Sequence, residues 1–331
     1  MQPTKVKAPD PQNAKFEDAN FPKGSSGLIA VDKIGNQILF LDPRTYATTL
    51  TLDAFAPRVH ELAISPDHKT AYVPIYGDGI HGKNPHPGHL IAVIDLVARR
   101  HAGDFSTYPY LAPHGLRWGP KGQLYCVCEN SGVVLEMNAD TGSIEHMIEV
   151  GSDKAHRIEV TPDGAKLYTE NEEDTFGCVI DLKARKRTKK VPAPNGLAGI
   201  GMSPDGTTIV LVDAKQPQIL IVDTASDEIV RTVRLEGHEK AAQIARYSPD
   251  GEYLIVTSYD APLGTIFNAK LETQELLQLG RGPMNMAFHP DGRTLLIANH
   301  DAGSLAVVDL EQAEVLRTVP AGVGIETLSF Y

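Results

Sequence analysis

The stretch from Ser203 to Leu235 reads SPDGTTIVLVDAKQPQILIVDTASDEIVRTVRL, and it decides the fold. It opens on Ser-Pro-Asp-Gly, a tight-turn signal in which proline restricts φ and glycine supplies a positive φ. Three runs follow the turn, TIVLVD, QILIVDT and EIVRTV, and each is typical of a short β-strand. Together with the apolar run AGIGM that precedes the turn, they predict four strands within about 40 residues.

The same turn recurs along the chain. Its prolines lie mostly 41 to 45 residues apart, with one gap of 54. Four short strands in a unit of this length are typical of a β-propeller blade. The related tetrapeptides begin at Ser65 (SPDH), Gly119 (GPKG), Thr161 (TPDG), Ser248 (SPDG) and His289 (HPDG).

The two ends of the repeat region supply one further blade. The N-terminal runs GLIAVDK, QILFLDP and TTLTLD match strands two, three and four, whereas IETLSFY (Ile325–Tyr331) matches a first strand. Pairing them would close the ring without a free edge. The sequence therefore predicts an all-β, seven-bladed propeller of four-stranded antiparallel blades. We expect one domain over residues 26–331, preceded by an irregular N-terminal extension over residues 1–25.

Composition excludes several classes of function. The chain has 331 residues and a net charge of −11, which argues against a nucleic-acid partner. No apolar run approaches a membrane span of about 20 residues. The first residues are polar and lack the apolar core of a secretory signal, so a cytoplasmic location is expected, although a secreted protein with its signal removed would look the same. Three cysteines favour reduced thiols. A closed ring has no need to oligomerise.

The quoted stretch and HPDGRTLLIANHDAGSLAVVDLEQAEVLRTV resemble the YVTN-type repeats of lactonase-like, cytochrome-d1-haem-domain-like seven-bladed propellers. This resemblance covers nearly the whole chain. It implies that the first strand of each blade lines a central channel and that the loops leading into these strands share one face. The superfamily contains lactonases, cycloisomerases, a lyase, surface proteins and redox-cofactor domains, so the resemblance implies a scaffold and leaves the reaction open.

One position of the repeat carries histidine in three consecutive blades. His60, His114 and His156 each lie six residues before the turn proline, and Glu326 occupies the same position in the closing blade. These four residues would then line one arc of the channel mouth. Three imidazoles and a carboxylate suit a divalent ion of the Zn, Fe or Mn type, with coordination positions left for water or substrate. The alternative is a histidine-lined channel without chemistry.

The gap of 54 residues arises from an insertion, YGDGIHGKNPHPGH (Tyr76 to His89), which we expect to form a lid over the same arc. Residues of this lid and of equivalent loops could move a proton. The predicted catalytic residues are Tyr76, His86, Glu172 and His300. The acidic run ENEEDTF (Glu170 to Phe176) lacks the spacing of a calcium loop and is expected to be solvated.

Four further residues are predicted to bind a small-molecule substrate. Arg157 and Arg246 suit a carboxylate or other anion, and Tyr110 and Asn285 would complete an anionic or phenolic site. The leading hypothesis is a metal-dependent lyase, isomerase or lactone hydrolase. The alternatives are a non-catalytic binding or scaffold module, and a metal-free lactonase or cycloisomerase that uses histidine and arginine.

Overall fold

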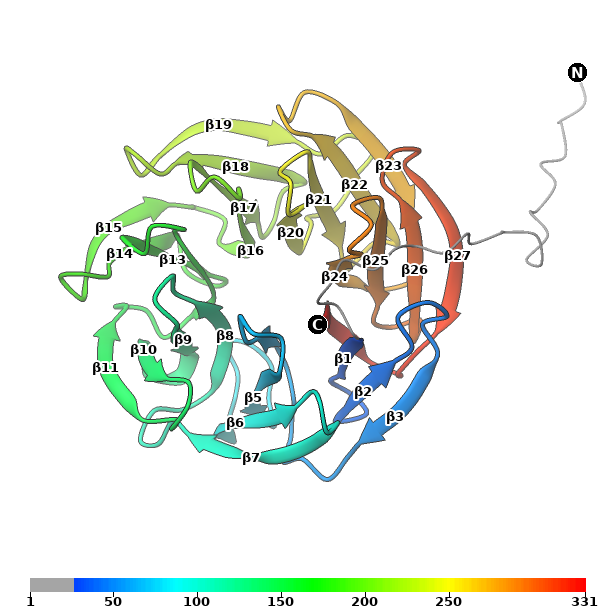
Figure 1. Ribbon diagram of the computed structural model, residues 1–331. Coiled ribbons are helices and arrows are strands. Elements are labelled where there is room, and N and C mark those ends of the chain that lie inside the picture. Colours follow the sequence, from blue (N-terminus) through cyan, green and yellow to red (C-terminus); the bar gives the residue numbers. More distant parts are fainter. Residues whose placement is uncertain (1–26) are drawn as a thin grey trace, which may run out of the picture.

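The computed structural model describes residues 27–331, and the expected N-terminal extension lies outside them. Seven four-stranded antiparallel sheets surround a central channel (Figure 1). The predicted seven-bladed propeller is confirmed. Within the described residues, no helix is long and apolar enough to cross a membrane.

Each blade runs from the channel outward through its four strands. Blade 1 contains β4 (Ala63–Ile64), β5 (Thr70–Gly77), β6 (Pro87–Asp95) and β7 (Arg100–Ser106). Blade 2 contains β8 (Pro113–Trp118), β9 (Gln123–Cys128), β10 (Val133–Asn138) and β11 (Ile144–Glu149), with the 3-10 turn η1 (Glu129–Ser131) after β9. Blade 3 contains β12 (Ala155–Val160), β13 (Lys166–Asn171), β14 (Phe176–Asp181) and β15 (Lys186–Pro192).

The remaining blades follow the same order. Blade 4 contains β16 (Leu197–Met202), β17 (Thr208–Asp213), β18 (Gln218–Asp223) and β19 (Glu228–Arg234). Blade 5 contains β20 (Ile244–Tyr247), β21 (Tyr253–Ser258), β22 (Leu263–Asn268) and β23 (Gln274–Gln278). Blade 6 contains β24 (Pro283–Phe288), β25 (Thr294–Asn299), β26 (Ser304–Asp309) and β27 (Glu314–Pro320).

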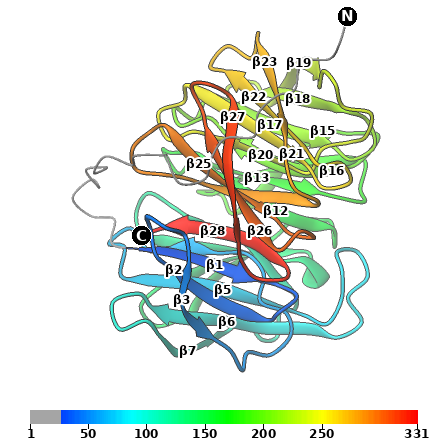
Figure 2. The same ribbon diagram turned by 90° about the vertical axis from the view of Figure 1, so that its right-hand side faces the viewer.

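Blade 7 closes the ring as the sequence predicts. Its order is β28 (Ile325–Phe330), β1 (Leu28–Asp32), β2 (Gln37–Leu41) and β3 (Thr48–Leu52). The side view of Figure 2 shows β28 lying along β1. Leu28 pairs with Phe330 and Val31 with Thr327, so the innermost strand comes from the C-terminal part of the chain.

The recurrent turn joins the two innermost strands of a blade. In blade 4, Ser203 Oγ donates to Asp205 Oδ1 over 2.6 Å and accepts from the backbone N–H of Thr208 over 3.0 Å. Gly206 has a φ of 72°, a conformation that glycine adopts without strain. The same hydroxyl-to-aspartate bond joins Ser248 and Asp250 in blade 5. The tag is therefore a side-chain-capped hairpin, and this explains its recurrence.

The apolar core lies between the blades. Seven buried clusters occur within residues 27–331, one at each interface between neighbouring blades. The inner strands are therefore buried on both faces, whereas outer strands such as β3 and β7 are largely exposed. The three cysteines are buried and free, as expected. Because each blade packs only on its two neighbours, loops at the channel mouth can vary without disturbing the core.

Blade 1 departs from the regular pattern in two places that affect the site. Its innermost strand is reduced to Ala63–Ile64, and the preceding residues, including His60 and Glu61, follow an irregular path. In addition, β5 and β6 are eight and nine residues long and form an extended hairpin. The predicted lid over Tyr76 to His89 is thus partly wrong. Its two ends belong to strands, and only residues 78–86 form the loop.

Candidate functional site

A cavity of about 290 Å³ opens at one mouth of the channel. The predicted residues that line it are His60, His156, Arg157, His300 and Glu326. Most of them come from the irregular segment before β4, from β12 and β28, and from the loop after β25. Ile80 and His81 of the 78–86 loop also line the cavity, so the loop does overhang the predicted arc.

The three predicted histidines meet at this mouth. The ring centroids of His60 and His114 are 4.1 Å apart, and the rings of His114 and His156 are stacked, with centroids 3.5 Å apart and planes inclined by 30°. All three side chains are buried. Burial lowers the pKa of each ring well below its ordinary value, and neighbouring positive charges add to this. The cluster therefore consists of neutral imidazoles, the form that binds metal ions.

The cluster keeps ring nitrogens available. His114 Nδ1–H donates to the carbonyl oxygen of His156 over 2.8 Å, which leaves the lone pair on Nε2. That Nε2 atom is buried and has no hydrogen-bond partner among residues 27–331, and the same holds for His60 Nδ1. Metal-binding histidines commonly direct their second nitrogen to a carbonyl or carboxylate in this way. Buried polar atoms without partners are costly, which points to an interaction with a bound species.

The tightest group of possible ligands is His60, Glu61 and His114. Within residues 27–331, these three offer ligand atoms that all lie within 4.8 Å of one another. The predicted partners His156 and Glu326 are nearby but outside this group. Stacked rings point their in-plane lone pairs side by side, so His156 does not converge with His114 on one point. The sequence pattern does not predict Glu61, because neighbouring residues of a regular strand point to opposite sides and His60 already points to the channel. The backbone before β4 is irregular, and it brings the Glu61 carboxylate and the His60 ring to the same group of possible ligands.

Glu326 joins a second set of polar groups on the cavity wall. Its Oε1 lies 3.5 Å from His60 Nδ1, and its Oε2 lies 3.2 Å from Lys33 Nζ. The Lys33 contact is an ion pair outside hydrogen-bond geometry, and within the described part of the chain both oxygens lack hydrogen-bond partners although they are buried. His300 Nε2 is 4.0 Å from Oε2, while His300 Nδ1 contacts Asp301 Oδ1 over 2.8 Å. This contact lowers the pKa of Asp301, and His300, the partner of this carboxylate, lines the cavity.

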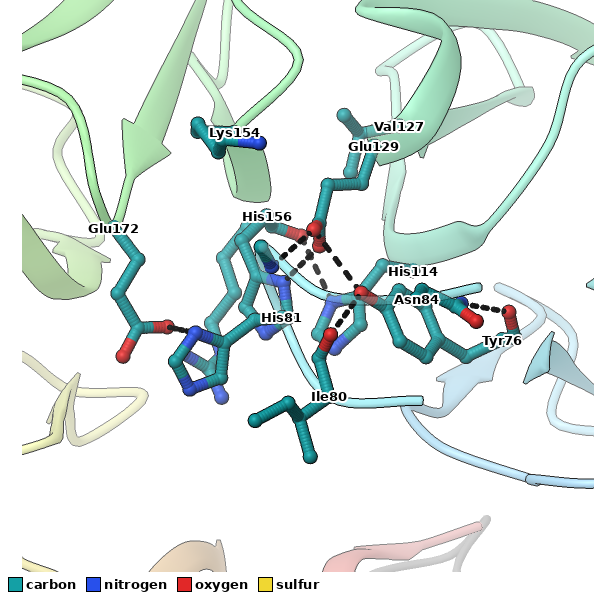
Figure 3. A network of polar contacts seen from close by, with 12 residues as sticks. Tyr76, Ile80, His81, Asn84, His114, Val127, Glu129, Lys154, His156 and Glu172 are labelled. Carbon is teal, nitrogen blue, oxygen red and sulfur yellow. Dashed lines mark hydrogen bonds and ion pairs between the residues drawn. The ribbon is translucent and has the colours of Figure 1, made fainter. Parts of the chain in front are cut away.

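Glu129 links the histidine cluster to the loop above it. Its Oε2 lies 2.7 Å from His156 Nδ1, and its Oε1 accepts from the Tyr76 hydroxyl over 3.0 Å and from the Gly82 N–H over 2.8 Å. Figure 3 shows these contacts meeting at Glu129. Burial, followed by the charge of Glu129, raises the pKa of Tyr76 far above its ordinary value. Tyr76 therefore remains a protonated donor and does not suit the role of a base.

The loop also reaches across to blade 3. His81 Nδ1 lies 2.7 Å from Glu173 Oε1 and 3.4 Å from Glu172 Oε2, and Figure 3 shows His81 turned toward Glu172. Hydrogen bonding to Glu173 raises the pKa of His81. The predicted catalytic residue Glu172 thus stands at the rim and helps to fasten the loop. His86 of the same loop is exposed and does not line the cavity.

Arg157 lies in the floor of the cavity with its charge already matched. Its Nε is 3.1 Å from Glu61 Oε1, and its backbone N–H donates to Glu170 Oε2 over 2.8 Å. Glu170 is fully buried, and burial raises its pKa well above the usual range. The expectation of a solvated loop over Glu170 to Phe176 is therefore partly wrong, because Glu170 and Asn171 are buried in β13 and Phe176 begins β14. These pairings leave Arg157 less free to bind an anionic substrate than the sequence suggests.

Two predicted substrate residues line a different cavity. Arg246 and Asn285 border a space of about 380 Å³ whose lining includes Pro249 of a turn tag, and which therefore opens at the opposite end of the channel. Arg246 comes three residues after Gln243, which lines the first cavity, and this places it about 10 Å further along the channel. Tyr110 lies outside both cavities and packs against the core between blades 1 and 2. The repeat pattern therefore predicts the blade on which each residue lies, but it does not predict the position of the residue along the channel axis.

Fold and site define a seven-bladed β-propeller with a histidine-rich cavity at one mouth. The sequence matches no family model and no curated protein. Among solved structures, the chain is similar to hydrazine synthase from Kuenenia stuttgartiensis, with a TM-score of 0.69 and 19% identity over 84% of this chain and 91% of that chain. At this identity the similarity shows the fold alone. The reaction must be argued from the site.

Proposed function

We propose that this propeller is a metal-dependent small-molecule enzyme whose active site is the cavity at the histidine-lined mouth. The observation that supports it most is the convergence of His60, Glu61 and His114, with ligand atoms within 4.8 Å of one another. The unpartnered nitrogens on His60 and His114 give the same indication. Glu326, which is buried beside His60, is the nearest additional carboxylate. The YVTN-type, lactonase-like resemblance of the repeats agrees with an enzyme but does not select a reaction.

His60, Glu61 and His114 would hold a divalent ion, which would supply a Lewis acid able to polarise a carbonyl oxygen of a substrate. The residues around it provide the rest of the chemistry. His300, oriented by Asp301 through Nδ1, keeps Nε2 free as a general base facing the cavity. Lys33 supplies a positive charge beside Glu326, which would favour an enolate or another developing anion. This arrangement suits proton abstraction next to a carbonyl or hydrolysis of a lactone.

The metal requirement is tested on protein purified without a histidine tag. Elemental analysis should find about one first-row divalent ion per chain, and titration with Zn²⁺ or Mn²⁺ should refill stripped protein. The double variant His60→Ala/His114→Ala should lose this ion. His146→Ala, an exposed histidine of β11, is the matched control and should keep it. Metal content that is equal in both variants would refute the site.

A metal-free lactonase or cycloisomerase would use the same cavity with a histidine and an arginine. The pairing of Arg157 with Glu61 disfavours this alternative, because a substrate anion would compete with that carboxylate. A non-catalytic binding module is the remaining alternative. Once a substrate is found, loss of turnover with chelator and recovery with added metal distinguish the proposal from both.

A further inference from the structure

The cavity at the opposite end of the channel has the composition of a ligand site. Its volume of about 380 Å³ lies within the range of small-molecule pockets. Its walls are largely apolar, and the polar side chains of Arg117, Arg246 and Asn285 are gathered among them. No residue lines both this cavity and the histidine-lined one. The apolar lining residues include Leu62, Leu116, Met286, Phe288, Leu328 and Phe330.

The charges at this end are unevenly matched. Arg117 forms a bidentate pair with Glu159, with Nη2 2.7 Å from Oε1 and Nε 3.0 Å from Oε2. Arg246 reaches the same carboxylate only at 3.5 Å. Its Nε donates instead to the neutral amide oxygen of Asn285 over 3.2 Å. One carboxylate thus serves two guanidinium groups, which leaves one positive charge in excess among these side chains.

Arg246 is the group with spare hydrogen-bonding capacity. Burial and the nearby charge of Arg117 lower its pKa to about 10, so it remains protonated at neutral pH while its charge is poorly compensated. The side chain keeps 26% of its surface exposed, and it borders the cavity. A guanidinium with this balance favours an added carboxylate, which it can bind through two parallel hydrogen bonds.

We propose that this end of the channel binds a small organic carboxylate with an apolar body, whose head group pairs with Arg246 and whose body packs on the surrounding apolar walls. Asn285 lies beside the head group, because its Oδ1 already contacts Arg246 and its Nδ2 is directed to Thr327 Oγ1 at 3.5 Å. Inorganic anions would gain the charge contact alone. Neutral molecules of the same shape would gain the apolar contact alone.

The protein carries a reporter for this cavity. Trp118 is its one tryptophan and lines the cavity beside Arg117. Intrinsic fluorescence therefore observes this end of the channel and not the histidine-lined mouth. Cyclohexanecarboxylate and hexanoate are suitable probes, because neither absorbs where tryptophan is excited. Cyclohexylmethanol is the neutral counterpart, and inorganic phosphate is the anion without an apolar body.

We expect the two carboxylates to change Trp118 emission saturably, and cyclohexylmethanol and phosphate to bind at least tenfold more weakly. Arg246→Gln should weaken carboxylate binding about tenfold, as loss of a charge-assisted contact implies. Arg246→Lys should recover part of it. Arg100→Gln, an exposed arginine of β7, is the matched control and should bind normally. Thermal melting confirms that each variant is folded.

Two results would overturn the proposal. One is the lack of saturable change in the native protein up to about 10 mM of either carboxylate, which corresponds to negligible affinity. The other is binding that is unchanged in folded Arg246→Gln or equally strong for cyclohexylmethanol. The double variant His60→Ala/His114→Ala should bind the carboxylates normally. The outcome is therefore independent of whether the metal site at the other mouth exists.

Discussion

Replacing Glu129 by alanine tests the contact network that joins the histidine cluster to the loop above it. The carboxylate accepts from the Tyr76 hydroxyl and the Gly82 N–H, and it contacts His156 Nδ1. It is 1% exposed, so water cannot replace it without a new cavity. The substitution should therefore destabilise the protein and loosen the 78–86 loop.

The cost follows from the groups left behind. Gly82 N–H and His156 Nδ1 lose their partner outright, whereas Tyr76 keeps a second contact with the Ile80 carbonyl oxygen at 3.3 Å. His156 is buried, and a buried polar group without a partner costs about 1–3 kcal/mol, whereas the partly exposed Gly82 N–H can turn to water and loses only about 1 kcal/mol of hydrogen bonding. Together these losses suggest about 3 kcal/mol. Unfolding entropy of roughly 2 cal/mol/K per residue gives about 0.6 kcal/mol/K for residues 27–331, and Tm should then fall by about 5 °C.

Differential scanning calorimetry measures this change, and amide hydrogen exchange over residues 78–86 measures the loosening of the loop. Glu129→Gln keeps one acceptor oxygen and the shape of the side chain, so it should lose about half as much stability. Glu149→Ala, an exposed glutamate on β11, is the control and should leave Tm within about 1 °C. If Glu129→Ala behaved like Glu149→Ala, the network would not hold the loop.

Three further expectations concern the ring. Ser203→Ala with Ser248→Ala should reduce stability more near neutral pH than in acid, because the serine hydroxyls lower the pKa values of Asp205 and Asp250 below the ordinary 3.8. This part of the stabilisation is present above 3.8 and disappears as the pH falls through the lowered values, whereas the lost acceptor for the Thr208 N–H is missing at every pH. The difference in urea midpoint between variant and native protein should therefore narrow toward acid pH, and a difference that does not change with pH would contradict the reasoning. Gly115→Ala should cost about 1–3 kcal/mol in urea unfolding, because its Cβ would lie 3.0 Å from Arg157 Cα and from His156 O. Unchanged stability would show that β8 and β12 can separate freely. Tyr331→Ala should cost about 3–5 kcal/mol by the same measurement, since Tyr331 is 2% exposed and its aromatic ring packs edge-on against Phe40, with 6.2 Å between the ring centroids. A loss under about 1 kcal/mol would mean that Tyr331 contributes little to closure of the propeller.

The seven-bladed fold, and the proximity of His60, His114, His156 and Glu326, could be predicted because equivalent positions of a repeat occupy equivalent places in the ring. The turn tag marks the same point in six of the seven blades, so a residue six positions before the proline reaches the same mouth. Ring closure then places Glu326 beside His60, and the two side chains are in fact 3.5 Å apart. The register thus predicted a contact between residues separated by most of the chain.

What the register could not provide is the path of the backbone where it leaves the regular strand. The ligand atoms of Glu61 and His60 lie close together because the segment before β4 is irregular. In a regular strand, these two neighbouring side chains would point to opposite sides. The glycine- and proline-rich lid was expected to be all loop, yet its ends continue the hairpin of β5 and β6. The register also does not predict how far along the channel axis a side chain lies. Arg246, expected at the histidine-lined mouth, therefore lies at the opposite end.

The charged pairs of the channel also bear on how the proposed enzyme would be inhibited. Arg157, paired with Glu61, lines the histidine-rich cavity, whereas Arg117 and Arg246, which share Glu159, line the cavity at the opposite end. Among the described residues, none lines both cavities. Under the proposed function, substrate and product would occupy the same cavity in turn, so we expect inhibition by product to be competitive.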